Sequence, residues 1–235
     1  MLNFILLQAS RNLTEAAGVV AAGQSGVEIS FLDMAIKGGW IMIPILLLSF
    51  VGVFIFVDRY FAVRKAGQVD SRLMDRVKEY ILQGKIDAAL ALCRSNDTPT
   101  ARMIEKGITR IGRPMPDVTA AIENVGNLEI SKLEKGLPVL ASVAGGAPML
   151  GFLGTVMGMI QAFYDMANAG NNIDVTLLSS GIYQAMVTTV AGLIVGIVAY
   201  FAYNILVSNV EKVVFKMEAA TSEFMDLLHE PAQNK

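Results

Sequence analysis

The sequence predicts an all-α integral membrane protein with three membrane-spanning helices and a helical cytoplasmic domain. Three observations lead to this fold class. The composition is 54% hydrophobic and only 17% charged, whereas a soluble domain usually carries about 25% charged residues. Residues 38–57, 136–164 and 175–210 contain no Asp, Glu, Lys, Arg or His. Finally, 14 of the 19 Lys and Arg residues lie between the first and the second of these stretches.

Each charge-free stretch is long enough to cross a bilayer, because a hydrocarbon core of ~30 Å needs about 20 helical residues. The first stretch has 20 residues, and the second and third have 29 and 36. At 1.5 Å per residue the longer two reach roughly 44 and 54 Å. We therefore expect the second and third helices to tilt or to extend into the cytoplasm.

The same pattern divides the chain into seven segments. Trp40 lies near the start of the first span, where an interfacial aromatic residue is expected. The expected segments are an N-terminal periplasmic or interfacial segment (1–36), transmembrane helix 1 (37–58), a cytoplasmic helical domain (59–135), transmembrane helix 2 (136–165), a periplasmic loop (166–174), transmembrane helix 3 with a cytoplasmic extension (175–210), and a cytoplasmic C-terminal tail (211–235).

The basic residues next to the spans predict the orientation. Arg59, Arg64, Lys65, Lys132 and Lys135 all flank the long loop between the first two spans. Lys and Arg near the ends of membrane helices favour the cytoplasmic side. This places the loop and the C-terminus in the cytoplasm and the N-terminus on the outer side of the membrane.

The loop itself reads as a series of short helices followed by one long one. Gly84 ends the first charged amphipathic helix, and Thr98 is suited to cap a helix that begins at Pro99. Asp117 is suited to cap the next helix, which has no evident break before the second span. We expect one continuous helix over 117–165, whose charges form a solvated face or a partner surface.

The composition and motifs exclude several classes of function. The net charge of −2 gives no indication of nucleic-acid binding. A phosphate-binding loop, an HExxH motif and a GxSxG motif are all absent from the sequence. With one cysteine, Cys93, and one histidine, His229, a Cys/His metal site is not expected. We expect neither an enzyme nor a bound cofactor.

Small residues form a stripe on the second span and another on the third. Pro148, Gly151, Thr155, Gly158 and Ala162 recur at helical spacings of 3 and 4. Such stripes allow helix backbones to approach closely in lipid. The residues expected to pack helices on the two spans are Pro148, Gly151, Gly154, Gly158, Ala185, Gly192 and Gly196.

Each stripe contains a threonine. It is Thr155 on the second span, and on the third span it is Thr189, between Ala185 and Gly192. These hydroxyls either bond to their own helix, which is a purely structural role, or line a narrow polar path. If Asp165 and Asp174 mark the outer surface, Thr155 lies roughly 15 Å inward and Thr189 roughly 22 Å inward. Both would then lie within the hydrocarbon layer.

The spans hold no carboxylate or histidine, the groups that relay protons across membranes. Gln184 is the most polar side chain of the third span. If this chain takes part in proton conduction, a partner must therefore supply the titrating carboxylate.

Three segments together resemble the ExbB/TolQ/MotA proton-channel family, and most closely its ExbB-like branch. They are KGGWIMIPILLLS, LEKGLPVLASVAGGAPMLGFLGTVMGMIQAF and GIYQAMVTTVAGLIVGIVAYFAYN. In the resemblance Thr155 and Thr189 match two pore threonines, and both are expected to face the pore or a neighbouring subunit. Gln184 stands where many relatives have glutamate, which removes a titratable group beside the expected path.

The resemblance implies a homopentamer whose second and third helices line a pore, with the proton as coupling ion. An ExbD-like single-span partner inside the ring would supply the intramembrane aspartate. Proton flow would then drive a TonB-like protein that energises import across the outer membrane. The subunit itself would be in contact with membrane lipids. The alternatives are a TolQ-like role in envelope integrity and division, a gliding or flagellar stator, and a non-conducting membrane scaffold.

Overall fold

The computed structural model describes residues 38–68, 72–168 and 175–229, and all regular structure within them is helical. The predicted segment 1–36 and most of the loop 166–174 lie outside the described residues. Over the described residues the helices are α3 (Met42–Ala66), α4 (Leu73–Leu82), α5 (Ile86–Ser95), α6 (Pro99–Ile108), α7 (Met115–Glu134), α8 (Leu137–Asn168) and α9 (Val175–His229).

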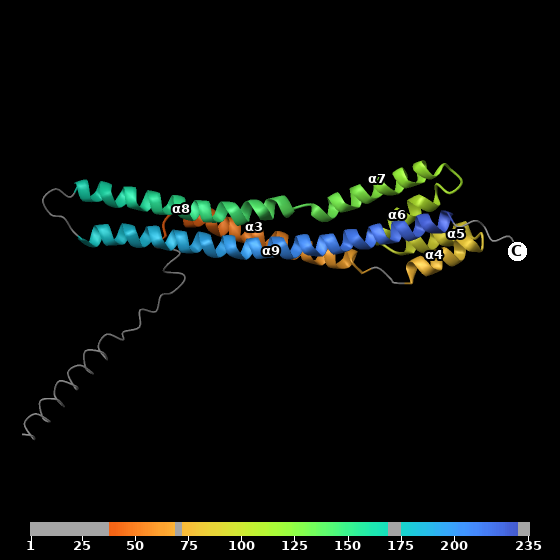
Figure 1. The fold of residues 1–235 in the computed structure, drawn as a ribbon. Helices are drawn as coiled ribbons and strands as arrows, with labels where there is room; N and C mark the ends of the chain where they lie inside the picture. Colours follow the sequence, from red (N-terminus) through yellow and green to blue (C-terminus); the bar gives the residue numbers. More distant parts are fainter. Residues whose placement is uncertain (1–37, 69–71, 169–174, 230–235) are drawn as a thin grey trace, which may run out of the picture. The chain divides into compact units, whose positions relative to one another are not determined.

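The described residues contain three helical segments that are long and apolar enough to cross a membrane. They are α3, the segment formed by α7 and α8, and α9. Helices α8 and α9 lie side by side over the whole length of α8, and α3 packs against both of them (Figure 1). The predicted fold class, an all-α protein with three spanning helices, is therefore confirmed. Helix α9 continues without interruption from the third charge-free stretch to His229, a length of roughly 82 Å for 55 residues.

The expected single helix over 117–165 is wrong, because the chain bends between α7 and α8. Lys135 leaves the helical conformation with ψ 125°, and Gly136 has a φ of +89°. Only glycine adopts this left-handed conformation readily, and the next helix restarts at once with Pro138 in its first turn. A Cβ on Gly136 would lie 3.3 Å from Ile55, so the bend also rests directly on α3.

Local capping follows the sequence in part. The Thr98 hydroxyl accepts a hydrogen bond from the Ala101 N–H at 3.3 Å, and α6 begins at Pro99 as expected. Gly84, with φ +70°, follows the end of α4. Asp117 does not cap α7: that helix begins two residues earlier, so Asp117 lies inside its first turn. A carboxylate there still complements the helix dipole.

Helices α4, α6 and α7 pack against α9, and α5 packs against α4 and α6. We call helices α4–α7, together with the C-terminal part of α9, the α4–α7 bundle. Its centre is Phe224 of α9, whose side chain is completely buried. A Cβ on Gly107 of α6 would lie 2.6 Å from the Phe224 ring and 2.8 Å from Ile122 of α7. The missing side chain at Gly107 therefore lets α6, α7 and α9 meet around one aromatic ring.

An ion cluster connects α3, α6 and α7 at the membrane end of the bundle. The buried carboxylate of Glu129 accepts hydrogen bonds of 2.6 Å from both Arg102 and Lys132. Arg102 also pairs with Asp97, which in turn accepts a 3.2 Å hydrogen bond from Lys65 of α3. The hydrogen bond from Arg102, followed by that from Lys65, lowers the pKa of Asp97. The α7 charges are thus not simply a solvated face.

Arg102→Gln is expected to lower the free energy of unfolding by about 2 kcal/mol, because Glu129 loses a charged hydrogen-bond partner. The Glu129 side chain is only 6% exposed, so water cannot replace the guanidinium well. The measurement is chemical unfolding of the purified protein followed by circular dichroism. Arg94→Gln is the matched control: its pair with Glu105 is more exposed, and its loss should cost less than about 0.5 kcal/mol. Equal costs for the two variants would contradict the assignment.

Cys93 is expected to resist alkylation in the folded protein. Burial, with a smaller contribution from the charge of Glu105, raises the pKa of this thiol from 9.0 to about 11. Since only the thiolate reacts, iodoacetamide at pH 8 should modify folded protein at least about a hundredfold more slowly than protein unfolded in denaturant. The raised pKa favours the folded state below pH 9, and this contribution is lost as the pH rises through 11. Equal rates of alkylation would show that Cys93 is accessible.

Candidate functional site

Helices α8 and α9 approach each other at backbone distance, because glycines face one another at the centre of the contact. A Cβ on Gly192 would lie 2.5 Å from the Ala147 carbonyl oxygen and 2.9 Å from the Cα of Gly151. A Cβ on Gly151 would lie 2.9 Å from the Thr188 carbonyl oxygen. A side chain at either position would therefore collide with backbone, which cannot move aside as a flexible side chain can.

The same close packing continues toward both ends of α8. Near Asn168, a Cβ on Gly181 would meet Ala162 at 2.5 Å, and one on Gly158 would meet Ala185 at 3.1 Å. Near Leu137, a Cβ on Gly196 would collide with the ring of Pro148 and lie 3.0 Å from the Ala144 carbonyl oxygen.

Pro148 lies inside α8 and has no N–H to donate to Ala144. The freed Ala144 carbonyl lies next to Gly196 of α9, where an added Cβ would approach its oxygen to 3.0 Å. The two small-residue stripes thus face each other within one chain.

Thr188, next to Thr189 on α9, was not among the site residues predicted from the sequence. Its side chain is 1% exposed and fills the space over Gly154, where an added Cβ would collide with it. Its hydroxyl donates to the Ala185 carbonyl of its own helix at 2.8 Å. Thr188 and Thr189 lie three and four residues after Ala185, so helical spacing alone fits both of them equally well.

Thr189 connects the two helices. Its hydroxyl lies 3.1 Å from the Gly151 carbonyl oxygen of α8 and 3.4 Å from the Ala185 carbonyl oxygen of α9. A hydroxyl has one hydrogen, which the two oxygens share. The side chain is only partly buried, so its hydroxyl lies at the edge of the contact between α8 and α9.

Thr155 lies on α8 at the margin of the stripe and is half-buried. Its hydroxyl donates to the Phe152 carbonyl of its own helix at 2.6 Å. Its neighbours on α8 include exposed apolar side chains, Phe152 and Met159 among them. In the single chain the Thr155 and Thr189 hydroxyls thus bond to separate carbonyls and not to each other. Their role in an ion path stays a prediction.

Gln184 is partly buried near the start of α9. Its amide nitrogen and carbon lie next to Gly39, where an added Cβ would collide with the amide. Gly39 has a φ of +71°, which is a second reason for glycine at this position. The turn that leads into α3 therefore packs against the Gln184 side chain.

The part of the chain that the structure describes contains no group of three or more His, Cys, Asp or Glu side chains placed to hold a metal ion. The chemistry of the α8–α9 contact is therefore that of hydroxyls and backbone carbonyls. Such groups can accept or pass on a hydrogen bond, but they do not titrate near neutral pH.

Comparison with known proteins confirms the resemblance drawn from the sequence. Residues 95–219, more than half of the chain, match the MotA/TolQ/ExbB proton channel family. An ExbB-like biopolymer transport protein of Synechocystis sp. is 30% identical over 221 residues, which cover 86% of this chain and 82% of the relative.

A TolQ protein of the Tol-Pal system of Haemophilus influenzae is 28% identical over 223 residues, or 88% of this chain and 97% of the relative. An ExbB homologue of Methanothermobacter thermautotrophicus is 28% identical over 188 residues, or 80% of this chain and 66% of the relative. Relatives named for ExbB and for TolQ thus match at similar identity. The chain belongs to the MotA/TolQ/ExbB proton channel family.

Proposed function

We propose that this protein is the pore-forming stator subunit of a motor in the bacterial inner membrane that is driven by the proton-motive force. The ExbB-like role, in which the motor energises TonB-dependent import across the outer membrane, is the first choice. It is favoured by the names of the relatives from Synechocystis and Methanothermobacter. The TolQ-like role is the second, because the Haemophilus TolQ is matched over nearly its whole length.

The observation that carries the proposal is the composition of the α8–α9 pair. The hydroxyls of Thr155 and Thr189 lie within the charge-free stretches 136–164 and 175–210. Proton transfer through a membrane needs a titrating group, and these stretches contain no carboxylate or histidine. The subunit is therefore one half of a proton path, and an ExbD-like single-span partner with an intramembrane aspartate supplies the other half.

The exposed surface of α8 supports assembly into a ring. Large apolar side chains project from this helix and leave its small-residue face to α9; they include Met149, Phe152, Ile160 and Phe163. In a homopentamer this surface would contact neighbouring copies and the partner helix. Pro148 and the glycines would keep their packing role inside each copy.

The distribution of charge supports the orientation. Lys and Arg are concentrated around the α4–α7 bundle and at the adjoining end of α3. This favours a cytoplasmic bundle and C-terminus, with the N-terminus in the periplasm. The ion cluster around Glu129 would then lie at the cytoplasmic surface of the membrane.

Thr155→Val and Thr189→Val are each expected to lower proton flux about tenfold, the effect of losing one hydrogen bond of about 1.4 kcal/mol along the path. The measurement is proton flux into proteoliposomes that contain the chain and its single-span partner. Ser142→Ala is the matched control, because the Ser142 hydroxyl of α8 also bonds to its own helix, at 2.9 Å from Pro138. That variant should conduct at the wild-type rate.

Native mass determination of each variant complex separates conduction from assembly. Both threonine variants should keep the wild-type ring and partner stoichiometry. If both conduct normally in an intact ring, the ion-path assignment is wrong. If the wild-type chain does not bind the partner at all, the membrane-scaffold alternative replaces the motor.

Complementation distinguishes the two envelope roles. The gene is expressed together with its single-span partner in bacteria that lack either ExbB or TolQ. An ExbB-like subunit should restore growth on iron bound to a siderophore and leave the detergent sensitivity of the TolQ-deficient strain unchanged. The reverse pattern would establish the TolQ-like role instead.

A further inference from the structure

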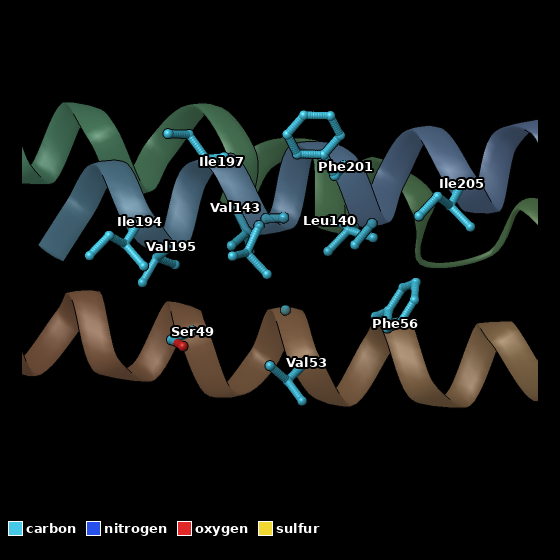
Figure 2. A pocket seen from close by; sticks show the side chains of 14 residues that line it. Ser49, Val53, Phe56, Leu140, Val143, Ile194, Val195, Ile197, Phe201 and Ile205 are labelled. Carbon is cyan, nitrogen blue, oxygen red and sulfur yellow. The ribbon is translucent and has the colours of Figure 1, made fainter. Parts of the chain in front are cut away.

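A groove runs between α3 and α9. It has a volume of about 400 Å³ and is lined almost wholly by apolar side chains. Figure 2 shows Phe56 pointing from α3 toward α9, with Leu140 and Val143 of α8 between the two helices. We call this feature the apolar groove.

The length of the apolar groove corresponds to one leaflet of the bilayer. On α9 it extends from Ile194 to Ile205, which is roughly 16 Å along the helix axis. Half of a ~30 Å hydrocarbon core is about 15 Å. The Ile205 end lies toward the C-terminus of α3, and the Ile194 end therefore lies near the middle of the membrane.

A second hollow, of about 350 Å³, continues between the same two helices beyond Ile205. Three cations line it, Arg64 from α3 and Lys212 and Lys216 from α9, together with Tyr60 and Asn209. Its lining contains no carboxylate, and no ion pair joins any of the three cations to a described residue. We call it the basic pocket.

The apolar groove and the basic pocket are contiguous. Phe56 lines the groove and Tyr60 lines the pocket, one helical turn apart, with ring centroids 5.8 Å apart. On the other wall Ile205 and Asn209 are likewise one turn apart. An elongated molecule can therefore occupy both hollows at once.

The position of the cations fits the headgroup layer. The charge-free stretch of α3 ends at residue 57, so Arg64 lies about 10 Å beyond the hydrocarbon along the helix axis, and Lys212 of α9 lines the same hollow. The headgroup region is some 5–7 Å thick on each side, and a long arginine side chain can reach back into it. The ammonium of Lys216 is held in place by a 2.9 Å hydrogen bond to the Gly67 carbonyl.

A favourable interaction with a helix dipole explains only some of the cations in the basic pocket. Arg64 lies in the last turn of α3, where a cation is favourable without any ligand. Lys212 lies far from either end of α9, so the dipole gives no reason for a cation there. Its charge faces the mouth of the basic pocket, next to the apolar groove.

We propose that the apolar groove and the basic pocket together form a binding site for one anionic glycerophospholipid of the leaflet that borders the C-terminal end of α3. An acyl chain fills the groove between α3 and α9. The phosphate lies in the basic pocket within reach of Arg64, Lys212 and Lys216. This site is separate from the proposed ion path, because neither Thr155 nor Thr189 lines the groove or the pocket.

The test is native mass spectrometry of the full-length complex, titrated with phosphatidylglycerol or with phosphatidylcholine of the same acyl chains. Wild-type protein should retain phosphatidylglycerol preferentially. The double variant Arg64→Gln/Lys212→Gln should bind it about 25-fold more weakly, since each basic residue near the surface contributes about fivefold. The control, Arg76→Gln/Lys85→Gln, removes the same charges from exposed positions of the bundle and should bind as wild type does.

Two further arms separate the possible occupants. Val198→Trp fills the apolar groove but keeps the cations, and this variant should also lose the lipid. In a separate competition experiment, soluble glycerophosphate should not displace phosphatidylglycerol from the wild-type protein. A photo-reactive benzophenone side chain in place of Val198 should yield a lipid adduct in membranes. A cross-link to a second copy of the chain instead, or equal retention of both lipids by all variants, would overturn the proposal.

Discussion

The close approach of α8 and α9 is the constraint on which the rest of this structure depends. In lipid there is no hydrophobic drive to bring helices together, so contact must come from backbone packing. Gly151 and Gly192 bring the two backbones to a distance at which no side chain fits between them. This fixes the axial position and the rotation of each helix. Every other surface of α8 and α9 is defined relative to that contact.

One consequence concerns the polar groups. Because the stripes face each other, Thr188 is enclosed between the helices, while Thr189 reaches the edge of the contact and bonds to Gly151. Thr155 is turned farther toward the exposed side of α8. The hydroxyls at the margin are thus presented where a neighbouring helix can meet them. The enclosed one is used for packing alone.

Much of the fold could be predicted from the sequence, because charge-free length is a strong physical requirement for crossing a membrane. The bend at Gly136 was missed, although Gly136 followed by Pro138 is the usual combination for a helix end and a new start. The burial of Glu129 was also missed. It follows Val118, Ile122 and Gly126 on one buried stripe of α7, so its position indicated a paired carboxylate.

The candidate site was less predictable for a different reason. Spacing places a residue on a helix face with a precision of about one position, and Thr188 and Thr189 occupy adjacent positions. Which hydroxyl is enclosed depends on the rotation of α9 against Gly154, a tertiary property. The surroundings of Gln184 depend similarly on the turn at Gly39, which is distant in sequence.

The contrast between α9 and the α7–α8 pair has a mechanical meaning. Three connections lead from the apolar helices to the bundle built around Phe224, and α8 and α9 provide two of them. One of them, α9, is a single helix of 55 residues, which behaves as a stiff rod and passes torsion along its axis. The other is jointed at Gly136, whose backbone has the freedom to flex. Helix α9 therefore provides the stiff connection to the bundle, whereas the connection through α8 and α7 can change its angle at Gly136.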